Sequence, residues 1–205
     1  MPAWTLRKPF IVFLIVLNIA FIGVILWLAP KTVRVRVSKE TSANGLPVLA
    51  SAAPFELIRE TGESFKLSDL AGKNWVADFV FTRCPNQCPT MSFRFASLQK
   101  TLPKNVKLVS FSVDPQYDSP DKLQKYAERF QADSNRWVFL TGSFETIHKI
   151  QSDLKLVGTD TPEPGLHSLR FVLLDGEGRA RAYYDSEDNA SLAGLSKDVN
   201  RLETK

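Results

Sequence analysis

The sequence predicts an α/β fold in which helices cover a mixed β-sheet, with a transmembrane helix near the N-terminus. Three observations lead to this prediction. Residues 10–29 form an uncharged, apolar run. After residue 55, apolar runs of strand length alternate with segments whose apolar residues repeat at helical spacing. The pattern then ends in a hairpin signal and a last helix, and this order indicates a sheet that is partly parallel and partly antiparallel.

The run FIVFLIVLNIAFIGVILWLA, residues 10–29, is long enough to be a transmembrane anchor. Twenty helical residues span about 30 Å, the thickness of a bilayer's hydrocarbon core. Trp4 and Trp27 lie near its ends, where interfacial aromatic residues are common. The alternative is a cleaved signal peptide, but its apolar region is usually only about 7–15 residues long. No small-residue cleavage site directly follows the run, so we expect an uncleaved anchor.

We expect residues 1–9 to be cytoplasmic and the globular part to lie on the periplasmic side of a bacterial inner membrane. Basic residues flank the run on both sides, so the positive-inside rule is close to a tie. The expected orientation has two reasons. Only nine residues precede the run, and the cysteine chemistry described below suits an exported compartment. A bacterial membrane is expected because no mitochondrial targeting region precedes the run.

Residues 30–54 are expected to form a linker, and residues 55–205 a single globular domain. The second half of the linker is rich in Ser, Ala, Gly and Pro, a composition typical of connecting segments. Residues 31–39 are basic and are interpreted as a solvated stalk, with contact to anionic lipid head groups as the alternative.

Within the globular part, strands are predicted from apolar runs between turn residues and helices from apolar residues spaced by three and four. The predicted strands are 55–58, 64–67, 75–81, 106–113, 137–140, 169–174 and 179–184. The first predicted helix is 90–102, and the second has Ser119 as its N-cap, Pro120 as its first residue and an apolar stripe of Leu123, Tyr126, Ala127 and Phe130. The third is capped by Ser143 with Phe144, Ile147, Ile150 and Leu154 inward, and the last contains Leu192, Leu195, Val199 and Leu202. Residues 175–178, Asp-Gly-Glu-Gly, are expected to form the turn of the last hairpin.

The charge distribution argues against a nucleic-acid-binding protein. The chain has 26 basic and 22 acidic residues, of which six basic and no acidic ones lie in residues 1–39. The rest therefore has 20 basic and 22 acidic residues, a net charge of −2, and offers no basic patch. A scaffold built on many disulfides is also excluded, because the chain has only two cysteines.

Those two residues, Cys84 and Cys88, lie in the segment FTRCPNQCPTM between a predicted buried strand and a predicted helix. Ligand-binding loops are expected at this end of an α/β sheet. If the segment is helical, the two Cα atoms are about 6 Å apart, which permits either a disulfide or two thiolates on one soft metal ion. The helix N-terminus should also lower the pKa of a thiol placed there. Three roles of the two cysteines remain possible: a redox-active pair, a pair of metal ligands and a structural disulfide.

A third metal ligand would have to come from one of only two histidines. His148 lies beside the apolar stripe of a predicted helix and is expected on the surface. His167 follows a loop rich in Pro and Gly and precedes a strand, which makes it a credible ligand when combined with the cysteine pair. Thiolates and imidazole suit copper and zinc, but structural zinc normally takes four protein ligands. The three available donors therefore favour copper, as Cu(I) or Cu(II).

Three stretches of the chain resemble the Sco/SenC family: VFTRCPNQCPTMS, VSFSVDPQYDSPDKL and HSLRFVLLDGEGR. The resemblance runs from about residue 55 to the C-terminus. It implies a thioredoxin-like fold with an inserted hairpin and copper bound by Cys84, Cys88 and His167. It also implies a partner, because members of the family deliver copper to the binuclear copper centre of cytochrome c oxidase or reduce its cysteines. The CxxxC spacing differs from the CxxC of thioredoxins.

The loop departs from the family pattern at two positions. Arg83 replaces a common His and Asn86 a common Asp, so we expect a cation beside the thiolates to favour their charged form. Asp114 and Asp118 match acidic positions of the family, and Asp118 is interpreted as a turn former before the next helix rather than as a participant in thiol chemistry. Asp78, within a central strand, is either a buried partner of the site or edge-facing.

Three functions follow from these residues. The first is a membrane-anchored copper chaperone for assembly of the cytochrome c oxidase copper centre. The second is a thiol-disulfide oxidoreductase for exported proteins, in which Cys84 attacks and Cys88 resolves. The third is a passive domain with a structural disulfide, which closing so short a loop stabilises by less than about 3 kcal/mol.

Overall fold

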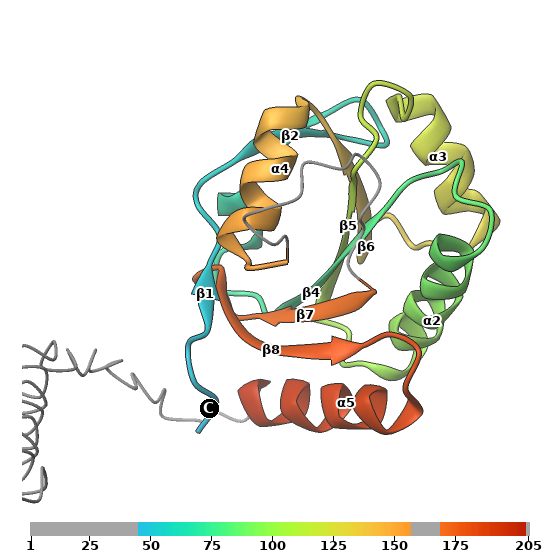
Figure 1. Cartoon of the computed structure of the whole chain (residues 1–205). Helices are drawn as coiled ribbons and strands as arrows, with labels where there is room; N and C mark the ends of the chain where they lie inside the picture. Colours follow the sequence, from blue (N-terminus) through green and yellow to red (C-terminus); the bar gives the residue numbers. More distant parts are fainter. Residues whose placement is uncertain (1–44, 157–168, 204–205) are drawn as a thin grey trace, which may run out of the picture. The chain divides into compact units, whose positions relative to one another are not determined.

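Strand β4 (Trp75–Val80) lies near the middle of the sheet and is buried along its whole length. This is a computed structural model, and it describes residues 45–156 and 169–203. The strands of the sheet lie in the order β1 (Ala50–Ser51), β8 (Arg179–Asp185), β7 (Arg170–Leu174), β4, β5 (Lys107–Ser112), β6 (Trp137–Thr141), β2 (Glu56–Arg59) and β3 (Ser64–Lys66). Figure 1 labels all of these strands except β3. Strands β4, β5 and β6 are parallel, whereas β7 pairs with β4 in the antiparallel sense. The mixed α/β sheet expected from the sequence is therefore confirmed.

The outer strands form antiparallel pairs at both edges. Strands β2 (Glu56–Arg59) and β3 (Ser64–Lys66) form a hairpin, and β2 also pairs with β6. Strand β8 (Arg179–Asp185) forms the predicted hairpin with β7. These bounds agree with the predicted strands to within two residues.

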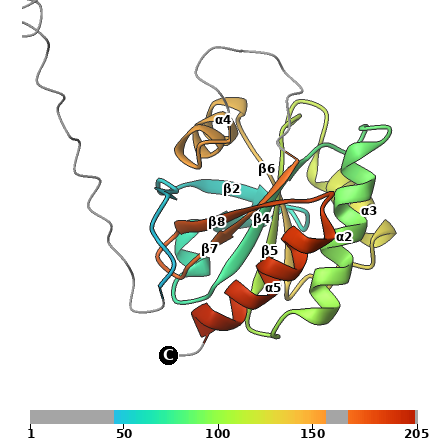
Figure 2. The same ribbon diagram turned by 60° about the horizontal axis from the view of Figure 1, so that its bottom comes forward.

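The helices lie on two sides of the sheet, as Figure 2 shows. One face of the sheet is covered by α2 (Gln87–Thr101), α3 (Pro120–Arg129) and α5 (Asn189–Glu203). Their shared apolar core includes Phe95 of α2, Leu195 of α5 and Val76 of β4. Helix α4 (Phe144–Asp153) and the 3-10 helix η1 (Leu67–Leu70) pack on the other face, around Ala77, Phe111 and Ile147. Alternate residues of β4 face opposite cores, as the two-residue period of a strand requires.

Part of the segment predicted as linker belongs to the folded sheet. Strand β1 (Ala50–Ser51) pairs with β8, and Leu46 is buried in the core. The carbonyl of Leu46 also accepts a hydrogen bond from buried Arg181. The fold therefore begins before residue 55, because these backbone and apolar groups find partners there.

Helix α2 begins three residues earlier than its apolar period suggests, at Gln87 instead of Thr90. The reason is that Pro89 is tolerated in the first turn, where its missing N–H has no helical partner to lose. Cys88 therefore lies inside the helix. This shift places one cysteine before the helix and the other in its first turn.

The prediction that Phe144 points inward was wrong. Its side chain is 43% exposed and stacks on the exposed ring of His148, with 5.8 Å between the centroids. Residues four apart lie on the same side of a helix, so the two rings meet outside the core. Ser143 caps α4 as predicted, because its hydroxyl accepts a hydrogen bond from the Thr146 N–H.

The predicted anchor at residues 10–29 lies outside the described residues. Among helices in the ranges 45–156 and 169–203, none is long and apolar enough to cross a membrane.

Candidate metal and thiol site

The two cysteines lie at the carboxyl end of β4, where the chain turns into α2. Crossover loops of parallel strands leave this end of the sheet open for ligands. A tight turn follows β4, because the Cys84 N–H donates to the carbonyl of Phe81 at 3.2 Å. Both cysteines are free thiols and pack with Val80 in a small apolar cluster of their own.

Cys84 is the sulfur that can react. It is 8% exposed, and its Sγ accepts a hydrogen bond from the Cys88 N–H at 3.3 Å. Burial raises the pKa of the Cys84 thiol, but the N–H groups of Cys88, Asn86 and Gln87 stabilise the thiolate more, so the pKa is lowered. These donors are the unpaired N–H groups at the start of α2, so the predicted effect of the helix N-terminus on a thiol pKa is confirmed.

Cys88 has the opposite environment. Its side chain is fully buried, and burial raises the pKa of its thiol, with the charges of Cys84 and Asp78 adding to the effect. The pair therefore combines one thiol whose pKa is lowered with a fully buried thiol whose pKa is raised. This split suits a soft metal clamp or a thiol-disulfide exchange in which Cys84 attacks first.

Asp78 lies in the core beneath the cysteines and not at an edge. It is fully buried on the face of β4 that packs against α2, opposite Ser110 of β5. Neither carboxylate oxygen makes a hydrogen bond of ordinary geometry within the described residues. Burial raises the pKa of Asp78 to about 7, and the nearby Ser110 hydroxyl offsets only part of this effect. A buried, unpaired carboxyl so close to Cys88 is costly, since buried polar groups normally have partners.

Asp118 does more than form a turn. It is fully buried, and its carboxylate accepts hydrogen bonds from the N–H and hydroxyl of Thr82 and from the hydroxyl of Ser112. Thr82 lies two residues before Cys84, so Asp118 ties the cysteine loop to the end of β5. The interpretation of Asp118 as a turn former was therefore incomplete. Its position after the strand was visible in the sequence, but the direction of its side chain was not.

Arg83 does not act on the thiols as expected. Its Nε donates to the Asp114 carboxylate at 2.6 Å, and its guanidinium lies over the ring of Tyr117. The groups that lower the pKa of Cys84 are the backbone N–H groups of Cys88, Asn86 and Gln87 and the Cys88 thiol, not Arg83. Asn86 is exposed at the N-cap of α2, where its side chain makes no capping hydrogen bond. The cation of the loop therefore faces the surface.

His167 lies outside the described residues, so the convergence of Cys84, Cys88 and His167 is not tested. His148 is exposed on α4, as predicted. Within residues 45–156 and 169–203, no group of three His, Cys, Asp or Glu residues is arranged to hold a metal ion. Strand β7 starts at Arg170 and runs antiparallel to β4, so the chain enters β7 at the sheet end where the cysteine loop begins.

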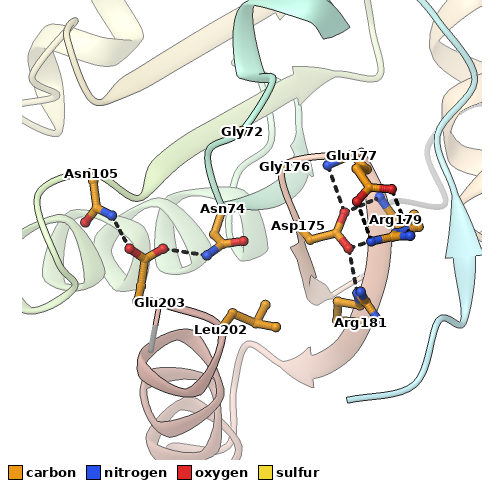
Figure 3. A pocket seen from close by; sticks show the side chains of 10 residues that line it. All are labelled: Gly72, Asn74, Asn105, Asp175, Gly176, Glu177, Arg179, Arg181, Leu202 and Glu203. Atoms are coloured by element: carbon orange, nitrogen blue, oxygen red, sulfur yellow. Dashed lines mark hydrogen bonds and ion pairs between the residues drawn. The ribbon is translucent and has the colours of Figure 1, made fainter. Parts of the chain in front are cut away.

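A second candidate is a polar cavity of about 340 Å³ at the opposite, amino end of β4, shown in Figure 3. Asp175 lines the cavity and forms ion pairs with Arg179 at 2.9 Å and with buried Arg181 at 2.7 Å. Glu203 accepts hydrogen bonds from the side-chain amides of Asn74 and Asn105. Burial raises the pKa of Asp175, but the N–H donors of the hairpin turn and both arginines lower it further, so the net shift is downward. These groups satisfy one another and indicate a structural role.

The chain is similar to proteins of one family over nearly all of its described part. The SCO1/SenC family model matches residues 46–201. The SCO1 protein homolog of Bacillus subtilis is 31% identical over 173 residues, which cover 77% of this chain and 86% of the relative.

Two solved structures have a similar fold. One is described as a member of the Sco family of cytochrome c oxidase assembly proteins with a disulfide switch, and it is 30% identical with a TM-score of 0.67. This match covers 77% of the present chain and 96% of the other. Arabidopsis thaliana ScoI with copper bound has a TM-score of 0.63 at 24% identity, covering 76% of this chain and all of that one, a likeness of fold. From the length of the family match and the identity to its relatives, the chain belongs to the SCO1/SenC family.

Proposed function

We propose that this protein is a membrane-anchored copper chaperone that binds copper through Cys84, Cys88 and His167. Copper is its cargo, delivered for assembly of the copper centre of cytochrome c oxidase. The observation that carries the proposal is the pair of free thiols at the head of α2, one of which has a lowered pKa. Thiolate sulfur is a preferred ligand of copper, and a lowered pKa favours the deprotonated form of Cys84 that binds a metal.

The chain's connectivity supports His167 as the third ligand. Leu169 lies next to the start of β7, and its carbonyl accepts a hydrogen bond from the Ser186 N–H. His167 lies only two residues before Leu169 in the sequence, and β7 begins at the sheet end that carries the cysteine loop. Imidazole combined with thiolate suits copper.

The relatives support copper as the cargo and the oxidase as the destination. Arabidopsis ScoI is described with copper bound, and the Sco family is described as cytochrome c oxidase assembly proteins. The expected partner is therefore the copper-bearing subunit of the oxidase or another copper or thiol protein.

Copper titration of the reduced full-length protein in detergent, under anaerobic conditions, tests the proposal. We expect one copper per chain for the wild type and loss of tight binding in Cys84→Ser, Cys88→Ser and His167→Ala. His148→Ala is the matched control, because it removes the other histidine of the chain from an exposed position. Full copper retention in His167→Ala would rule out the three-ligand site.

The proposed location is a bacterial inner membrane, with residues 10–29 as a single span and the folded domain in the periplasm. The support is the uncharged run of twenty residues, long enough for one crossing. Protease added to spheroplasts should digest the domain without lysis. Protection until lysis would place the domain in the cytoplasm and contradict the proposed orientation.

A thiol-disulfide oxidoreductase is the second candidate, favoured by the split between the two thiols. Cys84, with its lowered pKa, is suited to attack a partner disulfide, and buried Cys88 to resolve the mixed disulfide. A relative is described as having a disulfide switch. This activity should survive His167→Ala and disappear in Cys84→Ser, whereas copper binding should be lost in both.

A further inference from the structure

Next to Cys84, the surface carries two cations held over one exposed aromatic ring. Tyr117 is 41% exposed. The Arg83 guanidinium carbon lies 4.9 Å from the ring centroid of Tyr117, and the Lys122 ammonium lies 3.4 Å from it. We call these three residues, Arg83, Tyr117 and Lys122, the cationic rim. The ring holds both charges in place, since cations within about 6 Å of an aromatic centroid are attracted to it.

The Arg83 guanidinium is held by Asp114 through its Nε and exposes its terminal Nη1 and Nη2 groups to a partner. Its Nε is bound to Asp114 at 2.6 Å, while its side chain is 59% exposed. Its terminal Nη1 and Nη2 make no hydrogen bond with any residue that the structure describes. The planar guanidinium presents paired N–H donors that match the two oxygens of a carboxylate. Asp114 therefore orients the group without using all of its donors.

Lys122 adds a charge that has no carboxylate partner in the described ranges. Its ammonium donates to the carbonyl of Tyr117 at 2.9 Å and makes no ion pair there. Asp118 does not compensate it from the surface, because Asp118 is fully buried with its oxygens bound to Thr82 and Ser112. The exposed neighbours of Lys122 on α3, Asp121 and Lys125, carry opposite charges. The positive groups that the rim exposes are therefore the outer edge of the Arg83 guanidinium and the Lys122 ammonium.

We propose that the cationic rim selects protein partners that present carboxylate groups beside the thiol, disulfide or copper ligand that meets Cys84. The inference deepens the proposed function by stating the chemistry of the partner. Arg83 directly precedes Cys84 in the chain, so their Cα atoms lie about 3.8 Å apart, and a protein partner large enough to cover Cys84 also covers the exposed edge of Arg83. Complementary charge at such a position raises the rate of productive encounter and disfavours partners of the wrong sign.

Two peptides that differ only in charge provide the test. Each contains one cysteine activated as a mixed disulfide with pyridine-2-thiol, flanked in one peptide by Glu and in the other by Gln. The Cys84 thiolate attacks the peptide sulfur, a new disulfide forms, and pyridine-2-thiolate leaves, takes a proton from water and is measured as the thione. The reduced full-length protein in neutral detergent is used at low ionic strength.

We expect the wild type to react about ten times faster with the Glu peptide than with the Gln peptide, and 0.5 M salt to remove most of this preference. Lys122→Glu and Arg83→Gln should reduce the preference to about twofold or less. Lys104→Glu is the control, because it makes the same charge change at an exposed site beyond the other end of α2. The rate with the neutral peptide reports whether each variant keeps Cys84 accessible.

Equal rates with the two peptides in the wild type, or an unchanged preference in Lys122→Glu, would overturn the inference. Copper stoichiometry, measured on the same preparations, separates this result from the proposed function. Copper binding without a charge preference would contradict only the proposed role of the cationic rim. A charge preference without copper binding would contradict only the proposed copper-chaperone function.

Discussion

The two ends of β4 differ in how their polar groups are satisfied. At the amino end, the cavity around Asp175 is lined by charges and amides that bind one another. At the carboxyl end, buried Asp78 has no hydrogen bond of ordinary geometry within the described residues, and two free thiols have pKa values shifted in opposite directions. The cavity around Asp175 is therefore lined by polar groups that already have partners. Unsatisfied groups and split pKa values, rather than empty volume, locate the chemistry.

The largest expected effect is the loss of stability on removing Asp175 at the amino end of β4. Asp175→Ala leaves Arg181, which is 2% exposed, without its carboxylate partner. Removing one member of a buried pair costs about 3–5 kcal/mol because the other charge stays buried. Urea unfolding of the full-length protein should show this loss, while copper stoichiometry stays unchanged. Glu177→Ala is the control, because Glu177 is 69% exposed and its pair with Arg179 should contribute at most about 1 kcal/mol. Loss of copper binding in Asp175→Ala would show that the two ends are coupled.

The second prediction concerns Asp78 and pH. Its pKa in the folded protein is about 7, above the value near 3.9 of an unfolded chain. Between these values the folded state keeps a proton that the unfolded state has lost, so stability falls as the pH rises from about 4 to 7. The loss from this group amounts to about 4 kcal/mol. Above the folded pKa the difference is constant.

Asp78→Asn should remove this dependence. The measurement is the free energy of unfolding of the reduced, metal-free protein from pH 4.5 to 8, compared between wild type and variant, which cancels the contributions of other groups. If the two curves run parallel, Asp78 is charged at neutral pH and has a partner in the folded protein.

The third prediction tests the link between Asp118 and the cysteine loop. Asp118→Asn keeps the volume but weakens three hydrogen bonds that reach Thr82 and Ser112. We expect a loss of about 2 kcal/mol, since hydrogen bonds to charged groups are worth about 1.5–3 kcal/mol each and Asn retains one acceptor. Alkylation of Cys84 by iodoacetamide should be faster, because the loop is held less firmly. Asp121→Asn, exposed on α3, should change neither quantity.

Much of the fold follows from sequence periodicity alone. The alternating and continuous apolar runs locate the strands because β4, β5 and β6 are buried on both faces. Ser143 and the turn at residues 175–178 were readable because capping and turn chemistry is local. The pairing of β1 with β8 was not readable, since Ala50 and Ser51 gain their role only from strands more than 125 residues away.

The site was predictable in its parts and not in its electrostatics. The spacing of Cys84 and Cys88 and the helix after them predicted a lowered thiol pKa, which the structure confirms for Cys84. The same spacing could not reveal that Cys88 is fully buried, because that depends on how α2 packs on β4. Arg83 was expected to favour the charged form of the thiols because it is adjacent to Cys84, but its side chain pairs with Asp114.

The smallest expected effect concerns an exposed aromatic residue at the carboxyl end of the sheet. Phe144 follows β6, which is parallel to β5, so it lies at the same sheet end as the cysteine loop. Because Phe144 is 43% exposed, Phe144→Ser should change the free energy of unfolding by no more than about 0.5 kcal/mol. Ile147→Ala, on the same helix but 1% exposed, should cost about 2–4 kcal/mol. Paired urea unfolding curves check both values. A loss of stability near that of Ile147→Ala would show that Phe144 is packed in the core. A negligible loss would show that the exposed aromatic ring of Phe144, at the sheet end of the cysteines, is not needed for stability.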